Sequence, residues 1–267
     1  MLRRILFISL ALLILSSALG FTKLTKTALA SSYTADANLE RQILASTVRI
    51  SLFAAITDDQ GNPQYITVNG QKSIQYTVGE GLGTLARSGQ DVFIVTHDHW
   101  TLLTANLHKA QFHTASGDLL LELSGMEFQQ LIRYRDGGTM TLNAPEELAA
   151  GLTAVPLGDG RSMQKNDVVL LAYRHPQTDV ISVVPMLVTE LTTHLEQPAY
   201  KLLSLNGERV VHGNSGGGLF VDGQLAANMW EIVFERQVLR TTGEVVSAKT
   251  QTDFSLAAQL PATIAVQ

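Results

Sequence analysis

The stretch best suited to chemistry is residues 212–219, His-Gly-Asn-Ser-Gly-Gly-Gly-Leu, in which small residues flank Ser215. Glycines on both sides let the backbone bend sharply without a Cβ clash, so the hydroxyl projects while neighbouring N–H groups converge. Amides beside a serine can bind the oxyanion that forms when the hydroxyl attacks a carbonyl. The stretch therefore indicates a nucleophilic serine; the alternative is a glycine-rich hairpin with an incidental serine.

The order of histidine and serine separates two families of serine hydrolase. Gly213-x-Ser215-x-Gly217 also fits the nucleophile elbow of α/β-hydrolases, in which the histidine follows the serine. No histidine follows Ser215 in this chain. The remaining order, histidine before acid before serine, is that of chymotrypsin. The chain resembles the trypsin-like serine peptidases, most closely the bacterial HtrA-like branch. It matches that branch's motif Gly-Asn-Ser-Gly-Gly-Pro at Asn214 and has Gly218 in the place of proline.

A second informative stretch joins Gly-x-Gly at 79–84 to an apolar strand at 92–96 that is followed by two histidines. In the resembling family such a strand ends in Thr-x-x-His, and Thr96 stands three residues before His99. His99 is therefore predicted to be the general base, with His97 a neighbour. A packed strand fixes the ring while its polar end faces a cleft, where it can take the serine proton. Histidines that merely occupy a strand end are the alternative.

The same two histidines also resemble the start of the metallo-β-lactamase motif, His-x-His-x-Asp-His. Histidines two residues apart can bind one zinc ion, but a competent site needs further ligands. Positions 101 and 102 are threonine and leucine where that motif has aspartate and histidine. These two differences disfavour the metal site.

The catalytic acid is expected between His99 and residues 152–173, a segment that resembles the HtrA-like entry into the second barrel. Asp118 and Asp136 are the aspartates in that interval. Asp118 lies in a predicted hairpin turn, where aspartate is common for local hydrogen-bonding reasons. Asp136 precedes the strand 140–142, as the family's aspartate does, and is the predicted triad acid. However, Gly137 and Gly138 intervene, and Thr139 stands where an acid is expected.

The rest of the chain is predicted to be all-β, because short apolar runs recur between turn signals such as Asn-Gly and Asp-Gly. Residues 39–50 are predicted to be a short helix or the entry to the first strand. Two segments are possible helices: residues 126–133, which fit a strand equally well, and residues 256–260. The resemblance implies two antiparallel six-stranded β-barrels, residues 46–150 and 151–267, with the site in the cleft between them. The predicted strands are 50–56, 65–68, 93–96, 119–123, 140–142, 168–173, 180–188, 219–221 and 225–232.

The N-terminus has the pattern of a secretory signal peptide over residues 1–30: two arginines, an apolar run, and Ala-Leu-Ala before Ser31. The alternative is an uncleaved membrane anchor at 5–21, and residues 31–45 form a leader. Removing residues 1–30 takes away four basic residues and no acid, so the net charge moves from −5 to −9. An acidic mature protein disfavours nucleic acid as a partner. Without cysteine, disulfides and thiol nucleophiles are excluded.

These features predict a secreted or periplasmic serine endopeptidase, without a PDZ domain, that acts on protein or peptide substrates. As the resemblance implies, Ser215 attacks the carbonyl, His99 moves the proton and Asp136 orients His99. The N–H groups of Gly213 and Ser215 form the oxyanion hole. No cofactor or metal is expected, and membrane contact is expected only if the N-terminal segment is retained. The alternative function is a catalytically impaired protease fold that serves as a secreted binding or scaffold protein.

Overall fold

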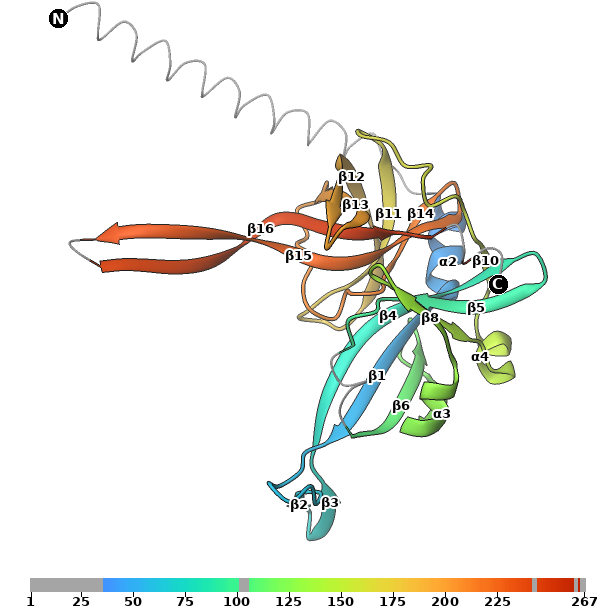
Figure 1. The fold of residues 1–267 in the computed structure, drawn as a ribbon. Coiled ribbons are helices and arrows are strands. Elements are labelled where there is room, and N and C mark those ends of the chain that lie inside the picture. The colour runs from blue at the N-terminus through green and yellow to red at the C-terminus, as the bar shows by residue number, and fades with distance from the viewer. Residues whose placement is uncertain (1–35, 101–105, 242–243, 262–263, 265–267) are drawn as a thin grey trace, which may run out of the picture.

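The computed structural model describes residues 36–100, 106–241, 244–261 and 264 (Figure 1). The predicted signal peptide or anchor, and the leader up to residue 35, lie outside the described residues. Among the helices that are described, none is long and apolar enough to cross a membrane.

The N-terminal half is an eight-stranded, mainly antiparallel sheet (Figure 1). Its strand order is β7-β6-β1-β4-β5-β9-β8, and the short β10 pairs in parallel with β4. Burial alternates along β1, as expected of a strand with one face on the core. The strands are β1 (Thr47–Ala55), β4 (Tyr76–Ser88), β5 (Asp91–Thr96), β6 (Leu107–Thr114), β7 (Leu119–Ser124), β8 (Ile132–Asp136), β9 (Thr139–Asn143) and β10 (Val155–Pro156).

The C-terminal half is a closed six-stranded barrel in the order β11-β12-β13-β16-β15-β14. Closure pairs every strand on both sides and leaves no exposed sheet edge within the barrel. The paired strands β15 and β16 extend beyond the barrel as a long hairpin (Figure 1). The strands are β11 (Val168–Arg174), β12 (Ile181–His194), β13 (Gln197–Ser204), β14 (Gly218–Val221), β15 (Gln224–Thr241) and β16 (Glu244–Gln259).

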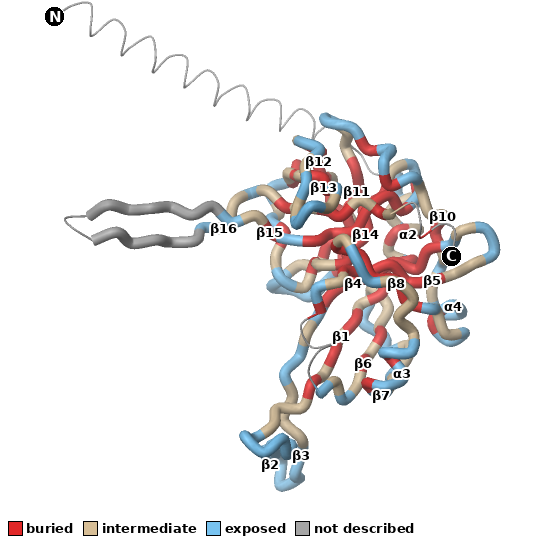
Figure 2. Tube along the Cα trace, viewed as in Figure 1, coloured by how far each residue is buried: buried red, intermediate tan, exposed pale blue. Residues whose placement is uncertain are grey.

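Three short helices and one hairpin complete the described chain. α2 (Ala37–Ser46) begins at Asp36, whose carboxylate accepts the N–H of Asn38 at 2.9 Å. A reciprocal capping box between Ser124 and Glu127 starts α3. The hairpin of β2 and β3 projects from the sheet and is largely exposed (Figure 2). The remaining bounds are α3 (Gly125–Gln130), α4 (Glu146–Gly151), β2 (Tyr65–Val68) and β3 (Gln71–Ile74).

One buried apolar cluster joins the two halves. Phe93 and Val95 of β5 pack there with Leu170 of β11 and Phe220 of β14, and all four side chains are at most 2% exposed. Burial of such side chains is the main favourable term in folding. Because β5 leads to His99 and β14 follows Ser215, the same packing fixes both strands that deliver the candidate residues.

The all-β fold class is confirmed, with three differences in detail. The N-terminal sheet has eight strands rather than six, because β10 adds to β4 and β7 extends the order beyond β6, and the order of its described strands runs from β7 to β8 without closing into a barrel. Residues 126–133 divide between α3 and β8. The helix considered at 256–260 is wrong, because residues 256–259 belong to β16, which pairs with β13 and β15 in the barrel. The division at residue 150 stays a prediction.

Candidate active site

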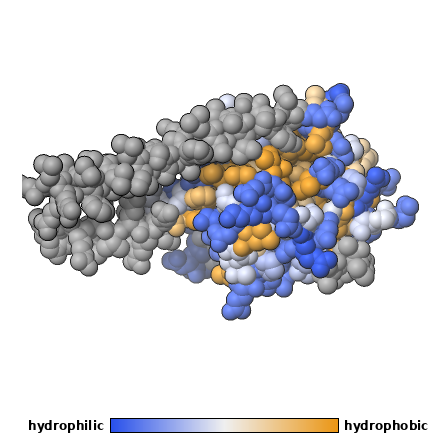
Figure 3. Space-filling view, turned by 90° about the horizontal axis from the view of Figure 1, so that it is seen from above, coloured by the Kyte–Doolittle hydropathy of each residue, from blue (hydrophilic) through white to orange (hydrophobic). Residues whose placement is uncertain are grey.

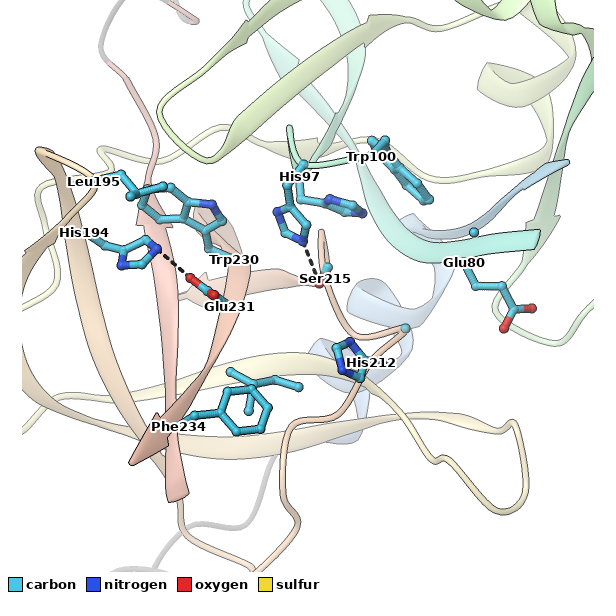
Figure 4. Close-up of a pocket in the computed structure, with 14 residues that line it drawn as sticks. Glu80, His97, Trp100, His194, Leu195, His212, Ser215, Trp230, Glu231 and Phe234 are labelled. Carbon is cyan, nitrogen blue, oxygen red and sulfur yellow. Dashed lines mark hydrogen bonds and ion pairs between the residues drawn. The ribbon is translucent and has the colours of Figure 1, made fainter. Parts of the chain in front are cut away.

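The structure brings His99 and Ser215 together from the two halves of the chain. His99 follows β5 and Ser215 precedes β14, and the distance from His99 Nε2 to Ser215 Oγ is 3.2 Å. The close-up shows the hydroxyl of Ser215 directed at an imidazole ring (Figure 4). A histidine nitrogen at this distance can accept the serine proton during attack on a carbonyl.

Close contact with the N-terminal sheet fixes the serine loop. The N–H of Leu82 in β4 donates to the carbonyl of Ser215 at 2.8 Å, and the Thr96 hydroxyl donates to the Leu82 carbonyl at 2.6 Å. Gly216 has φ of +82°, and a Cβ there would lie 2.0 Å from the Leu82 carbonyl oxygen. Only glycine fits this approach. Ser215 is therefore held against the strand pair that leads to His99.

The residues before Ser215 form a type II β-turn. The N–H of Asn214 donates to the Val211 carbonyl at 3.1 Å, and Gly213, the third residue of the turn, has φ of +93°. Within the described chain, the N–H groups of Gly213 and Ser215 donate to no protein acceptor. Both residues line the cavity beside the serine. Their two N–H groups are thus available to a carbonyl oxygen of a bound substrate.

Asn214 locks this turn onto the barrel. Its buried side chain accepts the N–H of Arg174 at 2.6 Å and donates to the carbonyl of Arg174 at 3.1 Å. An amide satisfies both main-chain groups, whereas a carboxylate has no hydrogen for the carbonyl. Arg174 ends β11, and its guanidinium lies 2.9 Å from the Glu80 carboxylate of β4. The turn is therefore tied to both halves.

His97 is buried beside the pair. Its ring centroid lies 4.1 Å from that of His99 and 4.1 Å from that of Trp100, on which it stacks. Neither ring nitrogen has a hydrogen-bond partner within the described chain. Burial, with smaller contributions from His99 and Arg135, holds the pKa of His97 well below its usual value. His97 is thus a neutral packing residue behind His99.

The structure does not bring either predicted acid to His99. The Asp136 carboxylate is exposed in the β8–β9 turn and accepts the N–H of Gly137 at 2.8 Å. Asp118 lies in the β6–β7 turn, where it accepts the hydroxyl of Ser116 at 2.8 Å. Within the described chain, no hydrogen bond or ion pair joins either carboxylate to His99. The assignment of Asp136 to the triad has no geometric support.

The carboxylate beside His99 belongs to Asp98. Its Oδ1 lies 3.9 Å from His99 Nδ1, and its Oδ2 accepts the N–H of Gly138 at 2.8 Å. Asp98 was not among the predicted site residues, because the resembling family has its acid downstream of the histidine. The available signal was an acidic residue directly before the predicted base.

Opposing effects set the pKa of His99. Burial lowers it, the carboxylates of Asp98 and Glu231 raise it, and His212 lowers it, with a net shift below the usual histidine value. A lowered pKa keeps the ring neutral at pH 7, which is the form that can accept a proton.

A cavity of about 550 Å³ opens beside Ser215. This volume lies within the range of sites for small molecules and peptide side chains. Trp230, Leu195 and Phe234 contribute apolar wall, and His194 Nε2 lies 2.5 Å from a carboxylate oxygen of Glu231 inside it (Figure 4). Seen from above, the surface of the molecule shows apolar patches between hydrophilic residues (Figure 3). The cavity is a mixed apolar and polar site next to Ser215.

Within the described residues, no three histidine, cysteine, aspartate or glutamate side chains are grouped as metal ligands would be. Positions 101 and 102, on which the metallo-β-lactamase alternative depends, lie outside the described residues.

Comparison with known proteins gives matches in structure but not in sequence. No protein-family model and no curated sequence matches the chain. The HtrA-type protease AlgW solved with a decapeptide matches at TM-score 0.53 and 14% identity, over 86% of this chain and 65% of that one. AlgW with a tripeptide matches at TM-score 0.50 and 13% identity, over 86% and 60%. The chain thus spans less than two thirds of the length of these neighbours. The likeness shows that it has the trypsin-like fold of HtrA-type proteases.

Proposed function

We propose that the chain is a serine endopeptidase that works outside the cytoplasm and cleaves protein or peptide substrates. The observation that carries the proposal is the 3.2 Å approach of His99 Nε2 to Ser215 Oγ beside an open cavity. Two AlgW structures with this fold contain bound peptides, which supports a peptide as the substrate class. The signal-peptide pattern at residues 1–30 supports export.

In the proposed acylation step, Ser215 Oγ attacks the scissile carbonyl carbon as His99 Nε2 removes the hydroxyl proton. The N–H groups of Gly213 and Ser215 bind the oxyanion of the tetrahedral intermediate. The C–N bond then breaks, and His99 gives its proton to the leaving amine. A water molecule, deprotonated by His99, hydrolyses the acyl-enzyme and restores Ser215.

A binding or scaffold protein is the second candidate function. The observation that favours it is the 3.9 Å separation of His99 Nδ1 from the nearest carboxylate, which exceeds hydrogen-bonding distance. Catalytic hydrogen bonds are often long without substrate and shorten on binding. The separation is therefore compatible with the enzyme as well, and the two functions are separated by experiment.

The test is incubation of the protein, expressed from its full sequence, with unfolded casein, followed by mass spectrometry of the fragments. We expect internal cleavage by the parent and none by Ser215→Ala, with both proteins retaining casein binding. Fragments from both proteins at equal rates would refute Ser215 as nucleophile. Binding by both without cleavage by either would favour the scaffold.

A further inference from the structure

Thr139 stands where the resembling family has its acid, and it belongs to a neutral hydrogen-bond network instead. Thr139, at the start of β9, is fully buried and its hydroxyl donates to Asn228 Oδ1 at 2.9 Å. The Asn228 amide in turn donates to the Gly138 carbonyl at 3.1 Å and the Thr96 carbonyl at 3.4 Å. These groups satisfy one another but carry no charge, so they cannot neutralise an imidazolium at His99 as a carboxylate does.

We propose that the Asp98 carboxylate takes this role: it orients His99 and stabilises its imidazolium during turnover. This inference rests on the proposed function, and it assigns Asp98 as a positioning residue that acts through His99. Asp98 reaches the same β8–β9 turn, because its Oδ2 accepts the N–H of Gly138, next to Thr139. Its other oxygen, Oδ1, is the one directed at His99 Nδ1, at 3.9 Å.

Two hydrogen bonds hold Asp98 in place, one to its main chain and one to its carboxylate. The side chain is 21% exposed, so it is partly shielded from water. Arg135 Nε donates to the Asp98 main-chain carbonyl at 2.9 Å. Gly138, which donates to the carboxylate, has φ of +82°, and a Cβ there would lie 2.4 Å from the ring of Trp230. Only glycine can present this N–H group here. With the Asp98 carboxylate held in place, a small movement of the His99 ring brings Nδ1 within hydrogen-bonding distance of Oδ1.

The charged groups around His99 support this role. Among them, the Asp98 carboxylate raises the pKa of His99 most, and Glu231 of β15 raises it less. His212 of the serine loop opposes them, and the buried His97 ring, tilted by 40° against the His99 ring, carries no charge at neutral pH. Arg135 reaches Asp98 only at its main-chain carbonyl among the described contacts. The anionic partner of the imidazolium on the Nδ1 side is therefore Asp98.

The test compares Asp98→Asn with Asp136→Asn, a matched control. Both carboxylates accept one main-chain N–H of the same turn at 2.8 Å, so both substitutions remove one charge and keep an acceptor. We expect Asp98→Asn to lower kcat on a peptide substrate by about 10²-fold with little change in KM. This is less than the loss of about 10⁴-fold for a hydrogen-bonded triad aspartate. Asp136→Asn should leave both constants unchanged.

The pH profile separates positioning from structural support. His99 must be neutral to act as base, so kcat/KM rises as pH passes the pKa of His99. Removing the Asp98 charge lowers that pKa, so the acid limb moves to lower pH in Asp98→Asn. A purely structural defect would lower activity without moving the limb. Asp98→Glu, which keeps the charge, should restore part of kcat and keep the limb near that of the parent.

An NMR titration of the His99 ring keeps the test independent of hydrolysis. We expect a lower pKa of His99 in Asp98→Asn than in the parent, and the parent value in Asp136→Asn. If the parent does not cleave peptides but this pattern holds, the proposed function fails and the Asp98–His99 coupling stands. An unchanged pKa of His99 in folded Asp98→Asn, or a larger kcat loss in Asp136→Asn, would overturn the inference.

Discussion

Gly213→Ala tests whether the type II turn before Ser215 presents an oxyanion-binding N–H group. Gly213 has φ of +93°, and a side chain at such a backbone angle costs about 1–2 kcal/mol. The turn can relieve this strain by rotating the peptide between His212 and Gly213 into a type I turn. That rotation would move the N–H of residue 213 away from the cavity. Loss of one oxyanion donor typically lowers kcat by about 10²–10³, or 2.7–4 kcal/mol.

Gly117→Ala is the matched control. Gly117 has φ of +99° in the β6–β7 turn, and a Cβ there would lie 3.6 Å from Arg49 Nη1. A Cβ at Gly213 would have a similar neighbour, Arg174 Nη1, at 3.1 Å. We expect both variants to lose about 1–2 kcal/mol of stability in urea unfolding. Only Gly213→Ala should lose kcat on a peptide substrate, with KM nearly unchanged. Equal kcat in the two folded variants would refute the role of Gly213.

Two further predictions concern stability. Asn214→Ala should lower the free energy of unfolding in urea by about 2–4 kcal/mol, because the N–H and carbonyl of Arg174 both lose their partner; a loss below about 0.5 kcal/mol would contradict this. Burial depresses the pKa of His97, so the folded protein binds this proton less readily than the unfolded chain does. The free energy of unfolding that depends on a neutral His97 is therefore complete above pH 6.5, and it is lost as pH falls from 6.5 towards the folded-state pKa. His97→Phe, which keeps the stacking on Trp100, should therefore flatten the acid-induced fall in unfolding free energy by up to about 1.4 kcal/mol per pH unit; an unchanged slope would show that His97 is not the group responsible.

Most strands could be predicted from the sequence, because apolar runs and turn residues mark them locally. The run 65–68 followed by Asn69-Gly70 is β2 with its turn, and both turn residues have positive φ. Residues 256–260 were ambiguous, because periodicity cannot separate a short apolar helix from a strand buried in a barrel. The start of α3 is marked in the sequence by Ser124 with Glu127 three residues later, the pattern of a capping box.

The candidate site was only partly readable, for a physical reason. The glycines around Ser215 and the strand before His99 are local features, and the structure places these two side chains together. The acid depends on contacts between residues far apart in the sequence. Asp98 reaches the β8–β9 turn through a hydrogen bond to Gly138, 40 residues away, and spacing alone does not reveal such a bond.

The most direct test of the account is the site of reaction with a fluorophosphonate, which labels only an activated serine. The full-length protein is treated, digested and examined by mass spectrometry. We predict one phosphonyl adduct, on the peptide that contains Ser215, absent from Ser215→Ala and formed far more slowly by His99→Ala. An adduct on another residue, or no adduct on the folded parent protein, would contradict the assignment of Ser215 as a nucleophile activated by His99.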